Sequence, residues 1–246
     1  MKVIDAVWEQ RNLGIHAYEI EMEMGDIQEE FENQIRNMSA DYISVKLPTG
    51  MTEFLNIIQA NGFTYCEDLI HVRHDLHSTQ RNSIQQRMYD LISYHMMDES
   101  EILELKQEIK DGMFSTDRFS TSGRFSKEQC ANRFSNWVDD LLSNGAIPYV
   151  MEYKGQHSGF IILTTKDDKV YQSVLGGAYA KFRKSGLGIV QKEQEIVKNL
   201  GGKYVETTVS SNNIGQLKAL IANGYMPVLI EHVFIKEVKN GGKFDE

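Results

Sequence analysis

The sequence has few cysteines, no long apolar run and no excess of basic residues. Cys66 and Cys130 are too few for a disulfide framework and favour a reducing compartment, the cytoplasm. No run approaches the roughly 18 apolar residues of a membrane span, and residues 1–10 lack the pattern of a signal peptide. The net charge of −9 argues against nucleic acid or an anionic membrane as the partner, and leaves room for a local basic pocket.

The 246 residues suffice for one large or two small domains, and the chain contains an internal repeat. The segments 42–47 and 53–63 resemble the segments 204–209 and 215–225, at one constant offset. Each copy predicts a strand, a helix that stops at an Asn-Gly pair, and a second strand. Two related modules are therefore expected, with boundaries at 1–80 and 88–246; convergence on a common αβ pattern is the alternative.

The stretch 182–190 carries the strongest functional pattern. An extended run, Val170 to Ala178, leads into it, and an amphipathic helix, Ile189 to Leu200, leads out. Gly186 and Gly188 let a backbone approach a ligand closely. The start of a helix adds unpaired N–H groups, so the turn predicts an anion site. A plain strand-to-helix turn, in which glycine only relieves strain, is the alternative.

The residues after the second glycine exclude two common phosphate motifs. A P-loop requires Lys-Ser or Lys-Thr where Ile189-Val190 stands, and a dinucleotide fingerprint requires glycine or alanine where Gln191 stands. The remaining pattern, Arg183-x-x-Gly186-x-Gly188, resembles the acetyl-CoA pyrophosphate loop of the GNAT acetyltransferases.

The order of expected elements in the second module agrees with this resemblance. We expect a strand over 89–97, helices over 99–109 and 127–142, three antiparallel strands over 147–178, the glycine loop, and then helix, strand, helix, strand. The resemblance implies an α/β GNAT fold, with a mixed, mostly antiparallel central sheet flanked by helices. A truncated GNAT-like module precedes it; there, 7–22 is expected to give a strand or two and 25–37 a helix.

Part of the chain resembles one acetyltransferase group more closely. The stretch from Asp117 through Arg133-Phe134 to Trp137 is similar to the helix-loop-helix of dTDP-fucosamine acetyltransferases. This implies an N-acetyltransferase that moves an acetyl group from acetyl-CoA to the amine of an amino sugar linked to a nucleotide. Arg118, Arg124 and Trp137 would then contact the acceptor, because arginine forks onto a diphosphate and an aromatic ring stacks on a base or sugar. The alternative is that Trp137 belongs to the helix core and that Arg124 is solvated.

The resemblance also assigns the residues that hold acetyl-CoA. The strand before the loop would pair with the pantetheine arm, and Gly176-Gly177 suits a bulge or a close approach there. Asn213 fits the family's cofactor-contacting asparagine, although a helix N-cap explains it too. The expected cofactor-binding residues are Leu175, Gly176, Gly177, Ala178, Arg183, Lys184, Ser185, Gly186, Leu187, Gly188, Ile189 and Asn213.

The sequence lacks the family's usual residues for the catalytic acid and base. The family's tyrosine position is Leu220, and a position that often holds a carboxylate is Gln172, which cannot take a proton at neutral pH. Tyr179 is the first candidate for the acid, with Tyr225 and Tyr171 behind it. Alternatively, solvent carries the protons, or the chain binds CoA without transfer as an interaction module. An acceptor that is another small amine or a peptide also stays open.

Metal and protein partners receive little support from the sequence. His71, His74 and His77 have a spacing that divides them between strand faces, so we expect solvated linker histidines and no metal. A sheet edge exposed in the first module would allow a homodimer.

Overall fold

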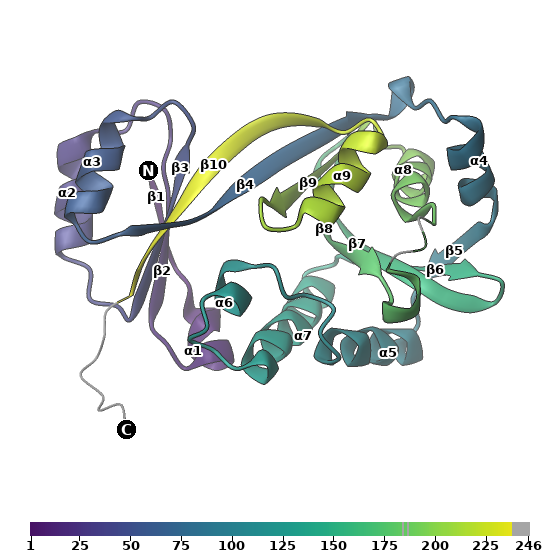
Figure 1. The fold of residues 1–246 in the computed structure, drawn as a ribbon, viewed down its shortest axis with the longest axis horizontal. Helices are drawn as coiled ribbons and strands as arrows, with labels where there is room; N and C mark the ends of the chain where they lie inside the picture. The colour runs from purple at the N-terminus through teal and green to yellow at the C-terminus, as the bar shows by residue number, and fades with distance from the viewer. Residues whose placement is uncertain (184, 186, 238–246) are drawn as a thin grey trace. The chain divides into compact units, whose positions relative to one another are not determined.

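The computed structural model describes residues 1–183, 185 and 187–237, which divide into two compact units. Unit 1 comprises 1–70, 210–212 and 229–237 of the described residues. Unit 2 comprises the described residues of 71–209 together with 213–228. The strands β4 (Thr64–Asp75) and β10 (Met226–Glu237) pass from one unit into the other (Figure 1). The predicted segments 1–80 and 88–246 rest on the sequence repeat and stay a prediction.

Unit 1 places two helices against a short mixed sheet. Its strands lie in the order β1-β2-β3-β10, with β2 and β3 parallel and the outer pairs antiparallel. Phe31 and Phe54, from the two helices, meet edge to face and pack with Val45 of the sheet. The elements are β1 (Lys2–Asp5), α1 (Val7–Leu13), β2 (Ala17–Glu21), α2 (Gln28–Arg36), β3 (Tyr42–Pro48) and α3 (Glu53–Ala60), followed by β4.

Unit 2 contains the glycine loop. Its first elements are η1 (Leu76–Ser78), α4 (Ser83–Asp90), β5 (Ile92–Met96), α5 (Glu99–Lys110), α6 (Arg118–Thr121), α7 (Lys127–Ser143) and β6 (Ile147–Tyr153). These are followed by β7 (Gln156–Asp167), β8 (Val170–Ala178), η2 (Ala180–Phe182), α8 (Ile189–Asn199), β9 (Tyr204–Ser210) and α9 (Ile214–Ala222).

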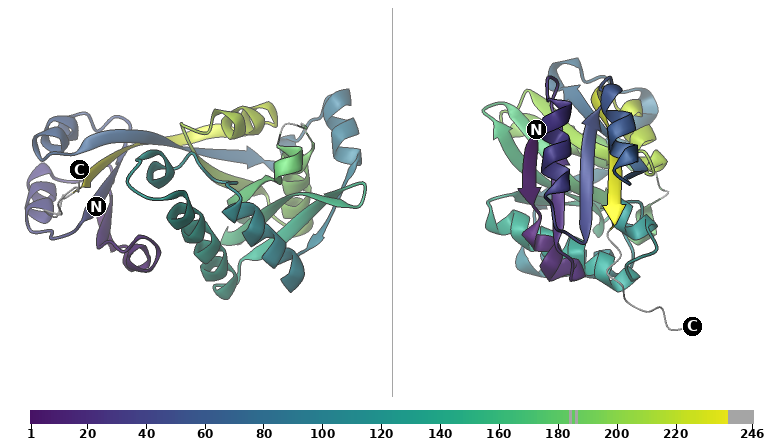
Figure 2. Two further views of the ribbon diagram at one scale, coloured as in Figure 1. Left: turned by 60° about the horizontal axis from the view of Figure 1, so that its bottom comes forward. Right: turned by 90° about the vertical axis from the view of Figure 1, so that its left-hand side faces the viewer.

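The strands of unit 2 form a mixed sheet covered on both faces. They lie in the order β9-β8-β7-β6-β5, antiparallel except for the parallel pair β8–β9. Figures 1 and 2 show α5 and α7 on one face and α8 and α9 on the other. Leu105 of α5 and Val138 of α7 pack on Phe160 of β7, and all three are fully buried. This confirms the predicted α/β fold class with a mixed, mostly antiparallel sheet.

Local rules explain most of the helix starts and stops. Asp98 and Ser126 each form a capping box with the residue three positions on, as expected of N-cap residues. In both copies of the repeat, the glycine after the helix has a left-handed backbone, with φ of 81° at Gly62 and 84° at Gly224. The predicted strand-helix-strand repeat is confirmed in both copies.

Three local predictions differ in part from the structure. Of the strand or two expected over 7–22, β2 forms at Ala17–Glu21, whereas Val7–Leu13 forms helix α1, which ends where Gly14 adopts a left-handed conformation. The stretch between the two expected modules, 81–87, falls largely within helix α4, which begins with a capping box between Asn82 and Gln85. The predicted strand at 89–97 begins only at Ile92, because α4 continues to Asp90.

Candidate functional site

The parting of β8 from β9 creates the candidate site. The two parallel strands pair only where Val170–Gln172 lies opposite Tyr204–Glu206. Just beyond, the hydroxyl of Thr207 donates to the carbonyl oxygen of Ser173 at 2.8 Å. From there to Ala178, β8 is paired with β7 on its other edge. No strand pairing with β9 is found along this part of β8 within the described residues, so its backbone can pair with a ligand.

A bulge in β8 lies directly beside the opening. On the β7 side, Leu175 pairs with Ile162 and Ser173 with Leu163, which leaves Val174 as the extra residue. The sequence suggested a bulge or a close approach at Gly176-Gly177; the bulge lies at Val174, and the glycines stay in regular register. Because side chains alternate between faces, the extra residue turns Ser173 to the same face as Gly176.

A cavity of about 350 Å³ follows this edge of β8. A Cβ on Gly177 would lie 3.6 Å from Met113, on the α5 side, whereas a Cβ on Gly176 would face Ile161, on the opposite side. All four residues line the cavity, so the cavity reaches both faces of the sheet.

Most of the residues expected to bind the cofactor line this cavity. They are Gly176, Gly177, Ala178, Arg183, Ser185, Leu187, Ile189 and Asn213. Leu175 faces the core instead, and Asn213 also caps α9 by accepting from the N–H of Gln216 at 3.1 Å. Lys184 and Gly186 lie outside the described residues.

One end of the cavity favours an anion. Arg183 lies there, beside the start of α8, where no described side chain caps the helix and no acidic residue occupies the first turn. The helix dipole and the amide groups of the first turn then favour negative charge.

The second glycine of the motif has a packing role. A Cβ on Gly188 would lie 3.0 Å from the backbone N and Cα of Tyr89, in α4. Gly188 therefore lets α4 approach the start of α8, and it is not among the residues that line the cavity. Burial and the neighbouring Glu195 raise the pKa of the Tyr89 hydroxyl to about 12.

Tyr179, the first candidate for the catalytic acid, is a core residue. It is 2% exposed, packs near Phe160 with ring centroids 6.4 Å apart, and does not line the cavity. Its hydroxyl has no hydrogen-bond partner among the described residues, and burial raises its pKa. Leu220 is likewise buried, and Gln172 lies in the last residue pair between β8 and β9. The catalytic role of Tyr179 stays a prediction.

A buried carboxylate that the sequence analysis missed does line the cavity. Glu193 extends from α8, is 5% exposed, and accepts a hydrogen bond from the Ser173 hydroxyl at 2.8 Å and another from the Tyr225 hydroxyl. The spacing could have indicated it, because Glu193 shares the helix face of Ile189 and Ile196.

The expected acceptor residues lie elsewhere in unit 2. The guanidinium of Arg118 lies 4.8 Å from the ring centre of Phe119, and that of Arg124 lies 5.3 Å from the ring centre of Phe125. Trp137 packs against the core beside Phe134. None of the three predicted acceptor residues lines the cavity, and their assignment stays a prediction.

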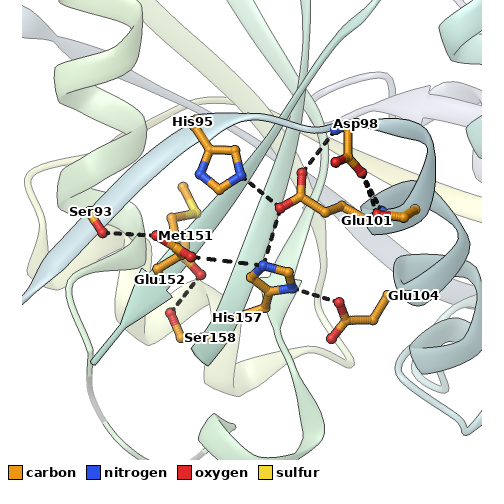
Figure 3. Close-up of polar contacts among 10 residues, drawn as sticks. Ser93, His95, Asp98, Glu101, Glu104, Met151, Glu152, His157 and Ser158 are labelled. Atoms are coloured by element: carbon orange, nitrogen blue, oxygen red, sulfur yellow. Dashed lines mark hydrogen bonds and ion pairs between the residues drawn. The ribbon is translucent and has the colours of Figure 1, made fainter. Parts of the chain in front are cut away.

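A second polar cluster joins α5 to β5, β6 and β7 (Figure 3). His157 lies 2.6 Å from Glu104 and 3.1 Å from Glu101, and His95 lies 2.7 Å from Glu101. Burial lowers the pKa of His157, but the carboxylates, Glu104 foremost, outweigh it and raise the pKa. These ion pairs tie the start of α5 to the sheet.

The three histidines near residue 74 are not grouped as a metal site. His74 is buried, with ring nitrogens 2.9 Å from the carbonyl oxygen of Gly224 and 2.9 Å from the Thr79 hydroxyl, so the expectation of a solvated His74 is wrong. His71 contacts the hydroxyl of Thr208. Within the described residues, no three His, Cys, Asp or Glu side chains are placed to hold a metal ion.

None of the described helices is both long and apolar enough to span a membrane.

Several solved structures that share this architecture are described as GCN5-related N-acetyltransferases. A GCN5-related N-acetyltransferase from Sphaerobacter thermophilus shares 13% identity, with a TM-score of 0.56 over 88% of this chain and 67% of the other. A tandem GNAT protein of the clavulanic acid biosynthesis pathway shares 12%, with a TM-score of 0.52 over 88% of this chain and 69% of the other. A fungal glucosamine N-acetyltransferase region shares 13%, with a TM-score of 0.60 over 80% of this chain and 25% of the other.

These similarities establish the fold. No family model matches the sequence, and no curated protein does. The GNAT fold expected from the glycine loop and the element order is thus confirmed by structure. The sequence identity is too low to identify a substrate.

Proposed function

We propose that unit 2 binds acetyl-CoA and that the protein transfers its acetyl group to the primary amine of a small molecule. The observation that carries this proposal is the cavity along the unpaired edge of β8, with Arg183 and the uncapped start of α8 at one end. A pyrophosphate fits that end by charge, and an extended amide-containing arm fits a strand edge by hydrogen bonding.

The residues present fit this group. Arg183 and the first-turn amides of α8 would hold the phosphates, and the backbone of β8 would pair with the arm. Gly176 and Gly177 leave space for it, because neither carries a side chain. Bound acetyl-CoA would supply a thioester as the acetyl donor.

The length of β8 supports a position for the acetyl end. From Ala178 back to Ser173 the strand covers about 17 Å, at roughly 3.3 Å per residue. An arm anchored at the loop and following β8 backwards therefore brings its far end toward the bulge at Val174 and toward Glu193.

For the acceptor we propose an amino sugar linked to a nucleotide. Support comes from the resemblance of 117–137 to dTDP-fucosamine acetyltransferases and from the structural likeness to a fungal glucosamine N-acetyltransferase region. Arg118 and Arg124 would contact the diphosphate. The acidic surface, with a net charge of −9, agrees with a cationic or small acceptor better than with nucleic acid.

The experiment is a thiol-release assay with acetyl-CoA and a panel of amines. We expect free CoA to appear with glucosamine or with dTDP- or UDP-linked amino sugars. Release only with peptides or polyamines would replace the acceptor proposed here. Saturable binding of acetyl-CoA without turnover on any amine would favour a non-catalytic CoA-binding module. Leu220 and Gln172 agree with that alternative, because they stand at positions where the family has a tyrosine and often a carboxylate.

A further inference from the structure

Glu193 is placed where a proton-transfer group would act in the proposed function. The face of α8 that carries Ile189 and Ile196 is turned to the sheet, and Glu193 stands on it. The residue is 5% exposed to solvent, yet it lines the cavity. The bulge at Val174 turns Ser173 toward it, and β8 and β9 separate at that level. Glu193 therefore lies where the acetyl end of the arm is expected.

Two hydroxyl groups hold the carboxylate in place. The hydroxyl of Ser173 donates to Oε2 at 2.8 Å, and that of Tyr225 donates to Oε1. Tyr225 is itself buried and stacks on His74, with ring centroids 5.3 Å apart. His74 is fixed by Gly224 and Thr79. The orientation of Glu193 is thus set by a chain of packed groups, as a preorganised reactive group requires.

The surroundings of Glu193 favour a carboxyl that can hold a proton near neutral pH. Burial raises its pKa, and the two hydroxyls, Tyr225 foremost, oppose the rise. No charged group contributes to this pKa among the residues that the structure describes. A buried carboxylate without a cation disfavours its charged form, and a base with a raised pKa suits catalysis near pH 7.

We propose that Glu193 takes the proton from the acceptor amine and returns it to the sulfur of CoA. The step rests on the proposed function and balances without a further reactant. The bond from the amine nitrogen to the acetyl carbon forms while the carbon–sulfur bond breaks. One proton leaves the amine for Glu193, and one proton passes from Glu193 to the thiolate. Ser173 and Tyr225 are positioning residues that keep both carboxylate oxygens oriented.

The first test compares Glu193→Gln with wild type in the thiol-release assay. Glutamine keeps the shape and loses the exchangeable proton, so kcat should fall about 10²- to 10⁴-fold, while the Kd of acetyl-CoA measured by calorimetry stays within a few-fold. Glu195→Gln is the matched control, because Glu195 lies on the same helix and pairs with Lys192. It should leave kcat unchanged.

The second test separates positioning from packing by the pH profile. Tyr225→Phe removes a donor to the ionised carboxylate, so the acid limb of kcat/KM should move upward by about one pH unit. The acceptor for this profile is an aryl amine that stays neutral across the pH range. If Tyr225 had only a structural role, Tyr225→Phe would lower activity at every pH and would not shift the acid limb of the kcat/KM profile.

The third readout needs no ligand. A buried acid with a raised pKa makes the folded state less stable as pH rises from its ordinary value of 4.5 toward the folded value. In urea unfolding, wild type should lose stability relative to Glu193→Gln across that window, and Glu195→Gln, which keeps Glu193, should lose stability relative to Glu193→Gln as well.

The outcomes separate this inference from the proposed function. Turnover by wild type that Glu193→Gln retains, with the same pH profile, overturns the role of Glu193 alone. A lack of turnover by the wild-type protein on every amine overturns both. Loss of turnover in Glu193→Gln with retained acetyl-CoA affinity, together with the shifted limb in Tyr225→Phe, supports both.

Discussion

The substitution Gly159→Ala should be strongly destabilising, because β7 has no room for a methyl group at this position. A Cβ there would lie 2.5 Å from Cδ1 of Ile189 and 2.6 Å from the carbonyl oxygen of Gly177. Ile189 can rotate its terminal methyl group away. The carbonyl of Gly177 belongs to the paired backbone of β8 and cannot move without disturbing the sheet.

The cost can be estimated from these contacts. Overpacking a well-filled site destabilises the folded state by about 1–3 kcal/mol. Alanine is less flexible than glycine in the unfolded chain, which stabilises the folded state by about 0.4–1 kcal/mol. We therefore expect a net loss of about 1–2 kcal/mol, which corresponds to a fall in Tm of roughly 2–8 °C for a chain of this size. Because Ile189 and Gly177 both line the cavity, the affinity for acetyl-CoA should fall as well.

Urea unfolding followed by circular dichroism measures the effect, and Gly215→Ala is the matched control. A Cβ on Gly215 meets only Oδ1 of Asn213, at 4.0 Å, and the position lies in helix α9. Alanine there should be neutral or stabilise by up to about 1 kcal/mol. If Gly159→Ala were as stable as wild type, the packing of β7 against β8 and α8 described above would be refuted.

Three further predictions concern stability. The raised pKa of His157 stabilises the folded state by up to about 1 kcal/mol; this stabilisation is fully present below pH 6.5 and is lost as pH rises through the folded pKa. Urea unfolding from pH 5 to 9 should show the loss in wild type and not in His157→Gln. The same pH dependence in both proteins would contradict the prediction. Gly188→Ala should cost about 1–2 kcal/mol through contact with the backbone of Tyr89, and an unchanged Tm would count against that close approach. Ser126→Ala should cost about 1 kcal/mol by loss of the α7 cap, which thermal unfolding followed by circular dichroism can measure; no loss would show that the cap is not needed.

The features that could be predicted from the sequence depend on neighbouring residues. Strand β8 and the starts of α5, α7 and α8 lie where the pattern placed them, because hydrophobic period, capping residues and glycine stops act within a few positions. The order of these elements in turn identified the fold.

The errors arose where local patterns were ambiguous. Val7–Leu13 is short and mixed in character, so its period did not distinguish a helix from a strand. Helix α4 has no fully buried residue, and its polar sequence resembled a linker. The reciprocal bonds between Asn82 and Gln85 were a local feature that could have identified it.

The site was predictable in part. The loop motif identified the lining around Arg183, because it is contiguous in the sequence. The helical spacing could have indicated which face of α8 carries Glu193, but its meeting with Ser173 and Tyr225 depends on tertiary packing and on a bulge that inverts the strand alternation, which spacing does not show. The cytoplasmic location and the homodimer stay predictions.

Calorimetric titration of the wild-type protein with acetyl-CoA tests the central claim most directly. We predict saturable binding at one site per chain, weakened about tenfold in Arg183→Ala by loss of one charge-assisted contact to the phosphates, with the Tm of the ligand-free variant unchanged. Absence of saturable binding, or equal affinity in Arg183→Ala, would contradict the assignment of the β8 cavity as the acetyl-CoA site.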